Sequence, residues 1–323
     1  SSRVPPVVPP SGGLLPSSFS NPDQARVADL RHTSIIASER CSMQAIGKAL
    51  WFIEANVGEP VSLDEVARAS GMSRFHLART FAALVGHPVV AYARGRRLTE
   101  AARRLADGAP DILSVALDAG YGSHEAFTRA FRDQFGLTPE EARTRRSLAN
   151  LAIVEAIRMP DQTTSMRAPD RFVNSGPMLF AGLRKYFRYE DRGGIPMLWH
   201  AFGAYQDRIP SVIPGGASGL CLGPPDAPDD CGFDYAPAVQ VKSLYDLPEG
   251  LSGIRVEARE WAVYLHREHV STVGATCAAA GEWLAQSGRT ATGPMQMIER
   301  YGPEFDPHTG MGGCEVWIPV APK

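Results

Sequence analysis

The hydrophobic and polar positions between Ser62 and Arg146 follow the same order twice. Val66-Ala67-x-Ala69-x-Gly71 returns 49 residues later as Val115-Ala116-x-x-Ala119-Gly120. Ser73-x-x-x-Leu77-x-Arg79-x-Phe81 returns 50 residues later as Ser123-x-x-x-Phe127-x-Arg129-x-Phe131. The offset grows by one between the glycine and the serine, so the second copy has a turn one residue longer. Each copy predicts a helix, a glycine turn and a second helix, which is the outline of a helix-turn-helix.

Local signals place the helices of the first copy. Ser62 and Glu65 match a capping box, which starts a helix, and Gly71 can end that helix in a left-handed conformation. Ser73 can cap the next helix by accepting a hydrogen bond from a free backbone N–H. The apolar positions of this next helix repeat at i, i+4 and i+7, and we expect its inner face to be Leu77, Phe81 and Leu84.

The second copy has an inner face made of phenylalanines, namely Phe127, Phe131 and Phe135. The outer faces supply the candidate DNA contacts, which are Arg74, Phe75, Ala78 and Arg79 in the first copy and His124, Glu125, Thr128 and Arg129 in the second. Arginine can bind guanine through two hydrogen bonds, so we expect base contacts from Arg79 and Arg129. Because the two sets differ in chemistry, we expect an asymmetric binding site. Thr138-Pro139-Glu140-Glu141 predicts one more helix after the second copy.

A long helical pattern joins the two copies, from about Pro88 to Ala106. Its roughly 19 residues span about 28 Å. Two major-groove faces on one side of B-DNA lie about 34 Å apart. The connecting helix is therefore nearly long enough to hold two recognition helices one DNA turn apart. A further helix is expected from about Met43 to Ala55, ahead of the first copy.

These residues resemble the DNA-binding domain of the AraC/XylS family of transcription regulators over about residues 41–147. The closest motifs are Gly71-Met72-Ser73-Arg74-Phe75-His76-Leu77-Ala78-Arg79-Thr80-Phe81 and Phe127-Thr128-Arg129-Ala130-Phe131-Arg132-Asp133-Gln134-Phe135-Gly136-Leu137-Thr138-Pro139. The resemblance implies an all-α double helix-turn-helix that binds double-stranded DNA through two adjacent major grooves. It also makes RNA polymerase a candidate partner.

The pattern changes after residue 148. Residues 148–170 read as a linker, although Ala149 to Ile157 could extend the preceding helix, and residues 1–40 read as a disordered, proline-rich arm. From about residue 171 the chain alternates strands with helices. The expected elements are strands over 178–187, 220–222, 239–241, 254–265, 295–299 and 315–320, and helices over 195–205 and 271–285. This order predicts two β-α-β-β units, an α+β arrangement with an antiparallel sheet.

Residues 171–323 resemble the GyrI-like domain, a small-molecule-binding module of multidrug-sensing regulators, placed after the DNA-binding domain in the Rob-type order. The resemblance rests on Met297-Ile298-Glu299-Arg300-Tyr301-Gly302-Pro303-Glu304-Phe305-Asp306-Pro307 and Glu315-Val316-Trp317-Ile318-Pro319-Val320. It implies that Glu299 lies at the floor of an aromatic cleft. The candidate aromatic residues are Trp199, Tyr235, Trp261, Tyr264, Trp283 and Tyr301. Two alternatives remain open: each aromatic residue can be a core residue, and Glu299 can pair with Arg300.

Composition narrows the function less than the motifs do. Residues 41–147 contain 14 Lys and Arg against 12 Asp and Glu, a net charge of +2, and residues 168–323 contain 13 against 18, a net charge of −5. Candidate phosphate contacts, or else ordinary surface charges, are Arg94, Arg96, Arg97, Arg103, Arg104, Arg143, Arg145 and Arg146. Five cysteines without a C-x-x-C pair argue against a disulfide framework or a zinc knuckle. We expect a cytoplasmic protein with no metal, no cofactor and no membrane segment.

The favoured interpretation is a transcription regulator, not an enzyme, whose C-terminal domain binds a small lipophilic or cationic effector. One alternative is a GyrI-like hydrolase of small molecules fused to a DNA-binding module, with Tyr235 or Tyr264 as a possible second catalytic group. Another is a DNA-binding protein whose second domain binds a protein partner such as gyrase.

Overall fold

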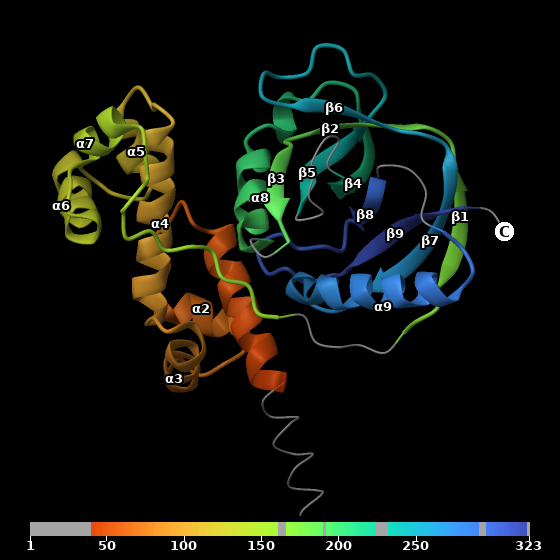
Figure 1. Cartoon of the computed structure of the whole chain (residues 1–323), viewed down its shortest axis with the longest axis horizontal. Coiled ribbons are helices and arrows are strands. Elements are labelled where there is room, and N and C mark those ends of the chain that lie inside the picture. The colour runs from red at the N-terminus through yellow and green to blue at the C-terminus, as the bar shows by residue number, and fades with distance from the viewer. Residues whose placement is uncertain (1–39, 161–165, 190–191, 224–231, 291–294, 322–323) are drawn as a thin grey trace, which may run out of the picture. The chain divides into compact units, whose positions relative to one another are not determined.

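The structure is a computed structural model that describes residues 40–160, 166–189, 192–223, 232–290 and 295–321. A helical part comes first along the chain and a part built on a β-sheet follows it (Figure 1). This order confirms the predicted multidomain class, an all-α part followed by an α+β part. The arm expected over residues 1–40 falls almost wholly outside the described residues.

The first helix-turn-helix forms as the capping signals predict. A helix over residues 40–55 precedes it, α2 spans Leu63–Ser70 and α3 spans Arg74–Val85. The Ser62 backbone N–H donates to Glu65 Oε2 at 2.7 Å, and the Glu65 backbone N–H donates to Ser62 Oγ at 3.2 Å, which completes the capping box. Gly71 ends α2 with φ +71°, a conformation that a residue with a Cβ adopts only at a cost.

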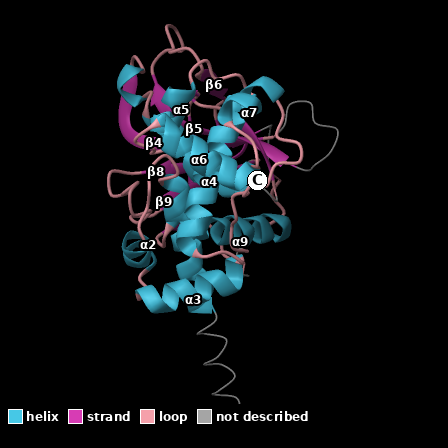
Figure 2. Ribbon diagram, turned by 90° about the vertical axis from the view of Figure 1, so that its left-hand side faces the viewer, coloured by secondary structure: helices cyan, strands magenta, loops and turns pink. Residues whose placement is uncertain are grey.

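The second helix-turn-helix repeats the first with a longer turn, as expected. The helices are α5 (Ile112–Asp118) and α6 (His124–Phe135), followed by α7 (Pro139–Arg145). The connecting helix α4 spans Val89–Ala106, and its 18 residues are about 27 Å long. Figure 2 shows α2 and α3 towards one end of α4 and α5, α6 and α7 towards the other. Each helix-turn-helix therefore packs on its own half of α4.

The predicted inner face of α3 needs one correction. Leu77 and Phe81 are fully buried, but Leu84 is 47% exposed and Val85 is buried in its place. The buried residues thus follow the i, i+4, i+8 row of α3, one of the rows through which helices pack against each other. The phenylalanine face of α6 is buried as predicted.

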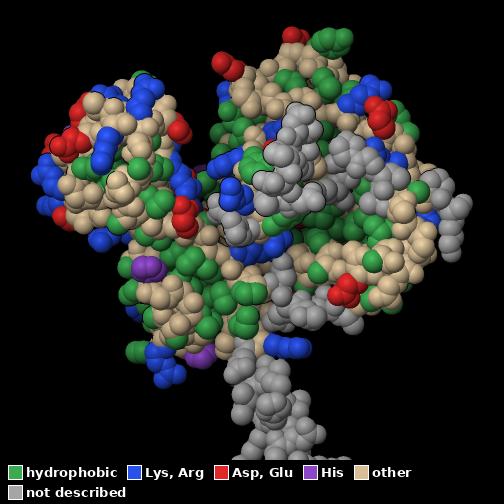
Figure 3. Space-filling model, in the orientation of Figure 1, with side chains coloured by type: hydrophobic (Ala, Val, Ile, Leu, Met, Phe, Trp, Pro, Cys, Tyr) green, Lys and Arg blue, Asp and Glu red, His purple; other side chains and the backbone are tan. Residues whose placement is uncertain are grey.

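Four of the eight arginines proposed as phosphate contacts are paired with carboxylates: Arg96, Arg103, Arg104 and Arg143. On the face shown in Figure 3, Lys and Arg side chains are interspersed with Asp and Glu. Arg103 pairs with Glu155, Arg104 with Asp118, and Arg143 with Glu140, at 2.5, 2.7 and 2.8 Å. Arg96 is fully buried, so a phosphate contact from Arg96 is ruled out. These arginines are paired with carboxylates inside the helical part. Fewer of the eight are therefore available to phosphates than the sequence pattern predicts.

Arg96 belongs to a buried polar network. Its Nε donates to Glu54 Oε1 at 2.8 Å and its Nη2 to Glu54 Oε2 at 2.9 Å, a two-pronged ion pair with both side chains at most 1% exposed. The Tyr92 hydroxyl donates to the same Oε1 at 3.0 Å. The pair joins the helix over 40–55 to α4. Burying two charges is favourable only when they are paired and hydrogen-bonded, as they are here.

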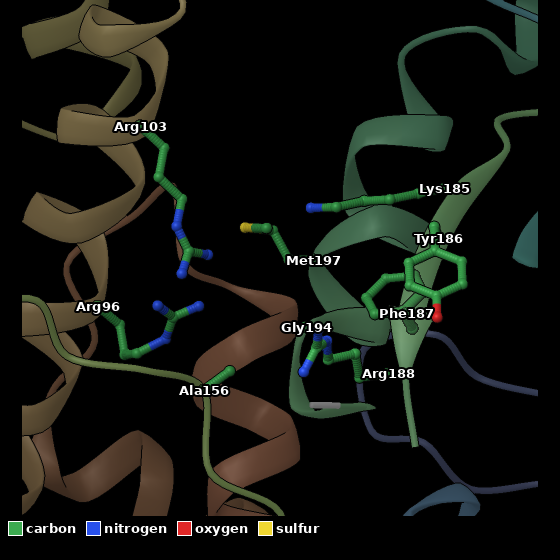
Figure 4. Close-up of a pocket in the computed structure, with 9 residues that line it drawn as sticks. All are labelled: Arg96, Arg103, Ala156, Lys185, Tyr186, Phe187, Arg188, Gly194 and Met197. Carbon is green, nitrogen blue, oxygen red and sulfur yellow. The ribbon is translucent and has the colours of Figure 1, made fainter. Parts of the chain in front are cut away.

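The same network holds the chain that follows α7. We call residues 148–160 the strap; the predicted helical extension over Ala149–Ile157 is wrong, because residues 151–160 have no regular structure. Arg96 Nη1 donates to the Val154 carbonyl at 2.8 Å, and the Ile157 backbone N–H donates to the Tyr92 hydroxyl at 2.9 Å. Figure 4 shows the strap passing at Ala156 beside the side of α4 from which Arg96 and Arg103 extend.

The second part contains a nine-stranded sheet, counted over the described residues, in which every pairing is antiparallel. The path is β1-β7-β9-β8-β4-β5-β2-β6, with β3 paired to β5. The strands are β1 (Arg171–Ser175), β2 (Met178–Gly182), β3 (Lys185–Arg188), β4 (Val212–Leu222), β5 (Gly232–Val241), β6 (Ser252–Val256), β7 (Arg259–His266), β8 (Met295–Tyr301) and β9 (Cys314–Val320). The helices are α8 (Ile195–Gly203) and α9 (Val273–Gln286).

This sheet differs from the predicted one mainly in where strands break. The strand expected over 178–187 is divided into β2 and β3, and the one expected over 254–265 is divided into β6 and β7. β6 ends the strand path and β7 lies near its other end, yet Val256 and Trp261 share one core. The sheet must therefore curl. α8 packs on β5, and α9 packs on β7 and β9. Two further hydrophobic clusters lie between these helices and the sheet, one containing Tyr264 and Tyr301 and the other containing Phe187 and Tyr235.

The buried ion pair makes a direct prediction about stability. Glu54→Gln leaves Arg96 buried without a counter-charge, which typically costs about 3–5 kcal/mol. Urea denaturation followed by the helical circular dichroism signal measures the loss. Glu257→Gln is the matched control, because its partner Arg255 is 61% exposed and exposed pairs contribute about 0–1 kcal/mol. A loss below about 1 kcal/mol for Glu54→Gln would show that the pair does not hold this part together.

Candidate functional site

The first recognition helix, α3, presents its predicted contact residues on the side away from the core. Phe75 is 89% exposed, a large apolar side chain held in solvent, and Arg79 is also exposed. Arg74 is exposed and lies 3.0 Å from Asp64, while Ala78 is half-buried. The four residues share one helix face, which can offer charge and apolar contact together.

The second recognition helix, α6, presents a different set. His124, Glu125 and Arg129 are exposed. Backbone hydrogen bonding at Glu125 itself and a hydrogen bond with Ser123 lower the pKa of the Glu125 carboxyl, so this acid also serves the N-terminus of α6. Thr128 is half-buried, and its hydroxyl oxygen is buried without a hydrogen-bond partner among the described residues. Of the four, Thr128 is the least accessible to a base edge.

Beside α6, Arg97 of α4 lies over the ring of Tyr121, 5.7 Å from its centroid. Burial lowers the pKa of Arg97, and its Nε and Nη1 have no hydrogen-bond partner in the described part of the chain. The Tyr121 ring contacts Phe127 edge-on at 5.4 Å, which fixes the turn of the second helix-turn-helix to the α6 core. Arg97 is thus half-buried support for α6 and not a simple surface charge.

The second candidate site centres on Glu299, which strand β8 carries on the face that α8 covers. The Tyr235 hydroxyl donates to Glu299 Oε2 at 2.6 Å, and the Tyr301 hydroxyl donates to the same atom at 2.9 Å. Trp199 Nε1 donates to the Tyr235 hydroxyl at 3.0 Å. The Trp199 ring also meets the Tyr301 ring edge-on, 5.2 Å between centroids. These four side chains line one cavity, together with Phe305.

A glycine outside the sequence-predicted site residues makes this arrangement possible. Gly219 of β4 pairs with Glu299 of β8 in the sheet register. A Cβ at position 219 would overlap the Tyr235 hydroxyl and lie 2.6 Å from Glu299 Oε2. Only glycine therefore leaves room for the phenol and the carboxylate to meet. A glycine inside a strand pattern is the signal that could have identified it, because such glycines mark close approaches.

Burial dominates the electrostatics of this cluster. Glu299 is 5% exposed, and burial raises the pKa of its carboxyl, while the hydroxyls of Tyr235 and Tyr301 and, least of all, Arg158 act to lower it. Burial, followed by the nearby Glu299 carboxyl, raises the pKa values of Tyr235 and Tyr301 well above their ordinary range. The two phenols are therefore neutral hydrogen-bond donors at neutral pH. The guanidinium of Arg300 lies over the Trp317 ring at 4.7 Å, so the expected alternative pairing with Glu299 does not form.

Three predicted aromatic ligands lie outside this group. Trp261 donates from Nε1 to Ser175 Oγ at 2.8 Å and packs against Trp317 in the core of the curled sheet. Tyr264 and Trp283 pack between β7 and α9, with ring centroids 6.5 Å apart. Side chains alternate along a strand, so Trp261 and Tyr264, three residues apart, face opposite sides of β7. Only Trp199, Tyr235 and Tyr301 join Glu299.

Other site classes have little support in the described residues. No group of three or more His, Cys, Asp or Glu side chains in the described ranges is arranged to hold a metal ion. None of the helices described has the length and apolar character needed to cross a membrane.

Comparison with known proteins identifies the two domains that carry these residues. A helix-turn-helix domain model matches residues 66–145, and a model of the GyrI-like small molecule binding domain matches residues 171–321. The right origin-binding protein of Escherichia coli is 30% identical over 299 residues, which cover 84% of this chain and 96% of that protein. The transcriptional regulator Rob of Salmonella typhimurium is 29% identical over 295 residues, with the same coverage. The multiple antibiotic resistance protein MarA of Escherichia coli is 37% identical over 98 residues, 30% of this chain and 77% of that protein.

The raised pKa of Glu299 predicts how its removal changes stability. The folded protein keeps the Glu299 carboxyl protonated to a higher pH than the unfolded chain does. Ionisation of Glu299 therefore lowers the free energy of unfolding once the pH rises above 4.5, the ordinary pKa of this carboxyl. Glu299→Gln should therefore raise the melting temperature at pH 7, and the gain should shrink as the pH falls towards 4.5, the ordinary pKa of the carboxyl, and be absent below it. Melting curves from pH 4 to pH 8 test this, with Glu257→Gln as the surface control. A variant less stable than the parent at pH 7 would contradict it.

Proposed function

This chain belongs to the AraC-type transcription regulators that carry a C-terminal GyrI-like domain, and from that premise we propose that its effector is a lipophilic cation bound at Glu299. The observation that carries the proposal is a buried carboxyl surrounded by three aromatic side chains. Trp199, Tyr235 and Tyr301 offer ring faces or edges to the same cavity.

The hydrogen bonds leave one carboxylate oxygen for the ligand. Both phenols donate to Oε2, and no protein group in the described ranges donates to Oε1. A cation that enters the cavity can therefore meet Oε1 without displacing a hydroxyl. Aromatic faces attract positive charge, with the strongest effect for Trp, and the attraction grows when water is excluded. A neutral ligand of the same shape would gain the apolar contact but not the charge pairing.

Hydrolysis by the same residues is the second candidate function. A general acid or base needs a second positioned group, and the 2.6 Å contact between Tyr235 and Glu299 supplies one. Incubation of the protein with a bound ester or epoxide, followed by chromatography of the mixture, separates the two functions. An intact ligand after prolonged incubation supports an effector site, and a product that Glu299→Gln fails to form supports the enzyme.

For the helical half we propose that α3 and α6 enter adjacent major grooves of double-stranded DNA. The support is the length of α4 and the two exposed faces that carry Arg79 and Arg129 at matching positions. RNA polymerase is the proposed protein partner, because a regulator bound beside a promoter lies where it can contact the polymerase. We propose no membrane partner.

The cation proposal predicts a split between two ligands. Glu299→Gln keeps the shape of the side chain and removes the charge, so a cationic ligand should lose several kcal/mol of binding free energy and its neutral carbon analogue little. Calorimetry with such a matched pair measures both. Ile195→Ala is the control, because this aliphatic side chain lines the same cavity and its loss should weaken both ligands alike. Equal binding of the pair to wild type and to Glu299→Gln would remove Glu299 from the site.

The DNA proposal predicts a change in base preference. Arg79→Ala removes a two-pronged contact worth about 1–3 kcal/mol of discrimination, so binding should weaken and one base position should become tolerant. Binding to a selected site and to each single-base variant measures this for Arg79→Ala and for Arg129→Ala. Arg255→Ala, remote from α3 and α6 in sequence, controls for the loss of one positive charge. Uniform weakening across all variants would mean that these arginines contact phosphates only.

A further inference from the structure

The connecting helix α4 has a weak point at its centre. Gly95 lies between the residues of α4 that pack with the first helix-turn-helix, such as Tyr92, and those that pack with the second, such as Leu98. Glycine in a helix interior costs about 1 kcal/mol relative to alanine, and helices bend readily at glycine. A bend at Gly95 would change the separation and the relative rotation of α3 and α6.

The strap covers this point. A Cβ at position 95 would lie 2.7 Å from Val154 Cγ2 and 3.3 Å from Val154 Cβ, so Val154 occupies the notch that the glycine leaves. The Val154 backbone N–H donates to Thr99 Oγ1 at 2.9 Å, and the Val154 carbonyl accepts from Arg96 Nη1 at 2.8 Å. Both backbone groups of one strap residue are thus bound to the α4 turn that follows Gly95.

The strap also contacts both hydrophobic cores of the helical part. Leu148, Leu151 and Ile153 pack on the core of the second helix-turn-helix, and Val154, Ile157 and Met159 pack on the core of the first. The change from one core to the other occurs between Ile153 and Val154, beside Gly95. The Ile157 backbone N–H adds a bond to the Tyr92 hydroxyl, one turn before Gly95. The strap therefore bridges the glycine with contacts on each side.

We propose that the strap holds α4 straight at Gly95 and thereby fixes the spacing of the two recognition helices. Gly95 and Val154 are then positioning residues for DNA recognition. This inference rests on the proposed entry of α3 and α6 into adjacent major grooves. A segment after the last DNA-binding helix then decides which spacing between the two half-sites the protein accepts. The two residues touch no DNA and act only through α4.

Spacing preference is the readout that separates this role from simple stabilisation. Full-length protein is titrated with its selected site and with versions that carry one base pair more or fewer between the half-sites. One base pair shifts a half-site by about 3.4 Å and rotates it by about 35°. Wild type should prefer its own spacing by on the order of tenfold or more, in the range of one mismatched base pair.

Gly95→Ala is the informative variant. It improves the intrinsic helix propensity of α4, so any loss of spacing preference cannot come from a weaker helix. The added methyl group displaces Val154. The preference for the selected spacing over sites one base pair longer or shorter should then fall to about twofold to threefold. Gly95→Ala combined with Val154→Ala makes room for the methyl group and should restore the preference. Gly281→Ala is the matched control, a helix-interior glycine of α9 with no atom within 4 Å of an added Cβ.

A second variant keeps the test decisive if Gly95→Ala folds poorly. Thr99→Val has nearly the same shape and removes only the bond to the Val154 backbone N–H, so it should relax the preference in the same direction. The inference is overturned if both variants keep the wild-type preference, or if they weaken binding equally at every spacing. If wild type itself binds no site with two half-sites, the proposed DNA-binding mode fails instead.

Discussion

The helical half depends on one buried ion pair. Glu54 and Arg96 are each almost completely removed from solvent, and each would be costly to bury alone. Together they fix the helix over 40–55 against α4, and Arg96 also holds the Val154 carbonyl of the strap. The helix over 40–55, the connecting helix and the chain after α7 thus meet at one guanidinium.

The C-terminal domain buries a carboxyl that has no guanidinium bound to it in the described residues. Glu54 has a guanidinium against both of its oxygens, whereas Glu299 accepts from two phenols on one oxygen only. Burial consequently raises the pKa of Glu299, and its ionised form is poorly compensated until a ligand supplies charge. The first carboxyl is therefore suited to structure and the second to binding. Gly219 makes the second arrangement possible, because a Cβ at this position would overlap the Tyr235 hydroxyl that binds the carboxyl.

Local signals were predictable from sequence, and long-range partners were not. The capping boxes at Ser62 and Thr138 and the phenylalanine face of α6 depend on residues within one or two helical turns, and all of them form. The roles of Arg96 and of the strap depend on partners that lie 42 to 65 residues away along the chain. In the second domain the family resemblance predicts Glu299 at the floor of an aromatic cleft, with Trp261 and Tyr264 as candidates for its lining. Alternation along β7 instead puts Trp261 and Tyr264 in two different cores.

The pH dependence of cation binding tests the central claim most directly. If Glu299 is the counter-charge, a lipophilic cation binds its ionised form. Burial raises the pKa of this carboxyl above its ordinary value of 4.5. Affinity measured by calorimetry on the full-length chain should rise with pH through this range, with release of a proton on binding, and Glu299→Gln should abolish both. An affinity that stays constant across the range, with no proton exchanged, would contradict the assignment of Glu299 as the cation site.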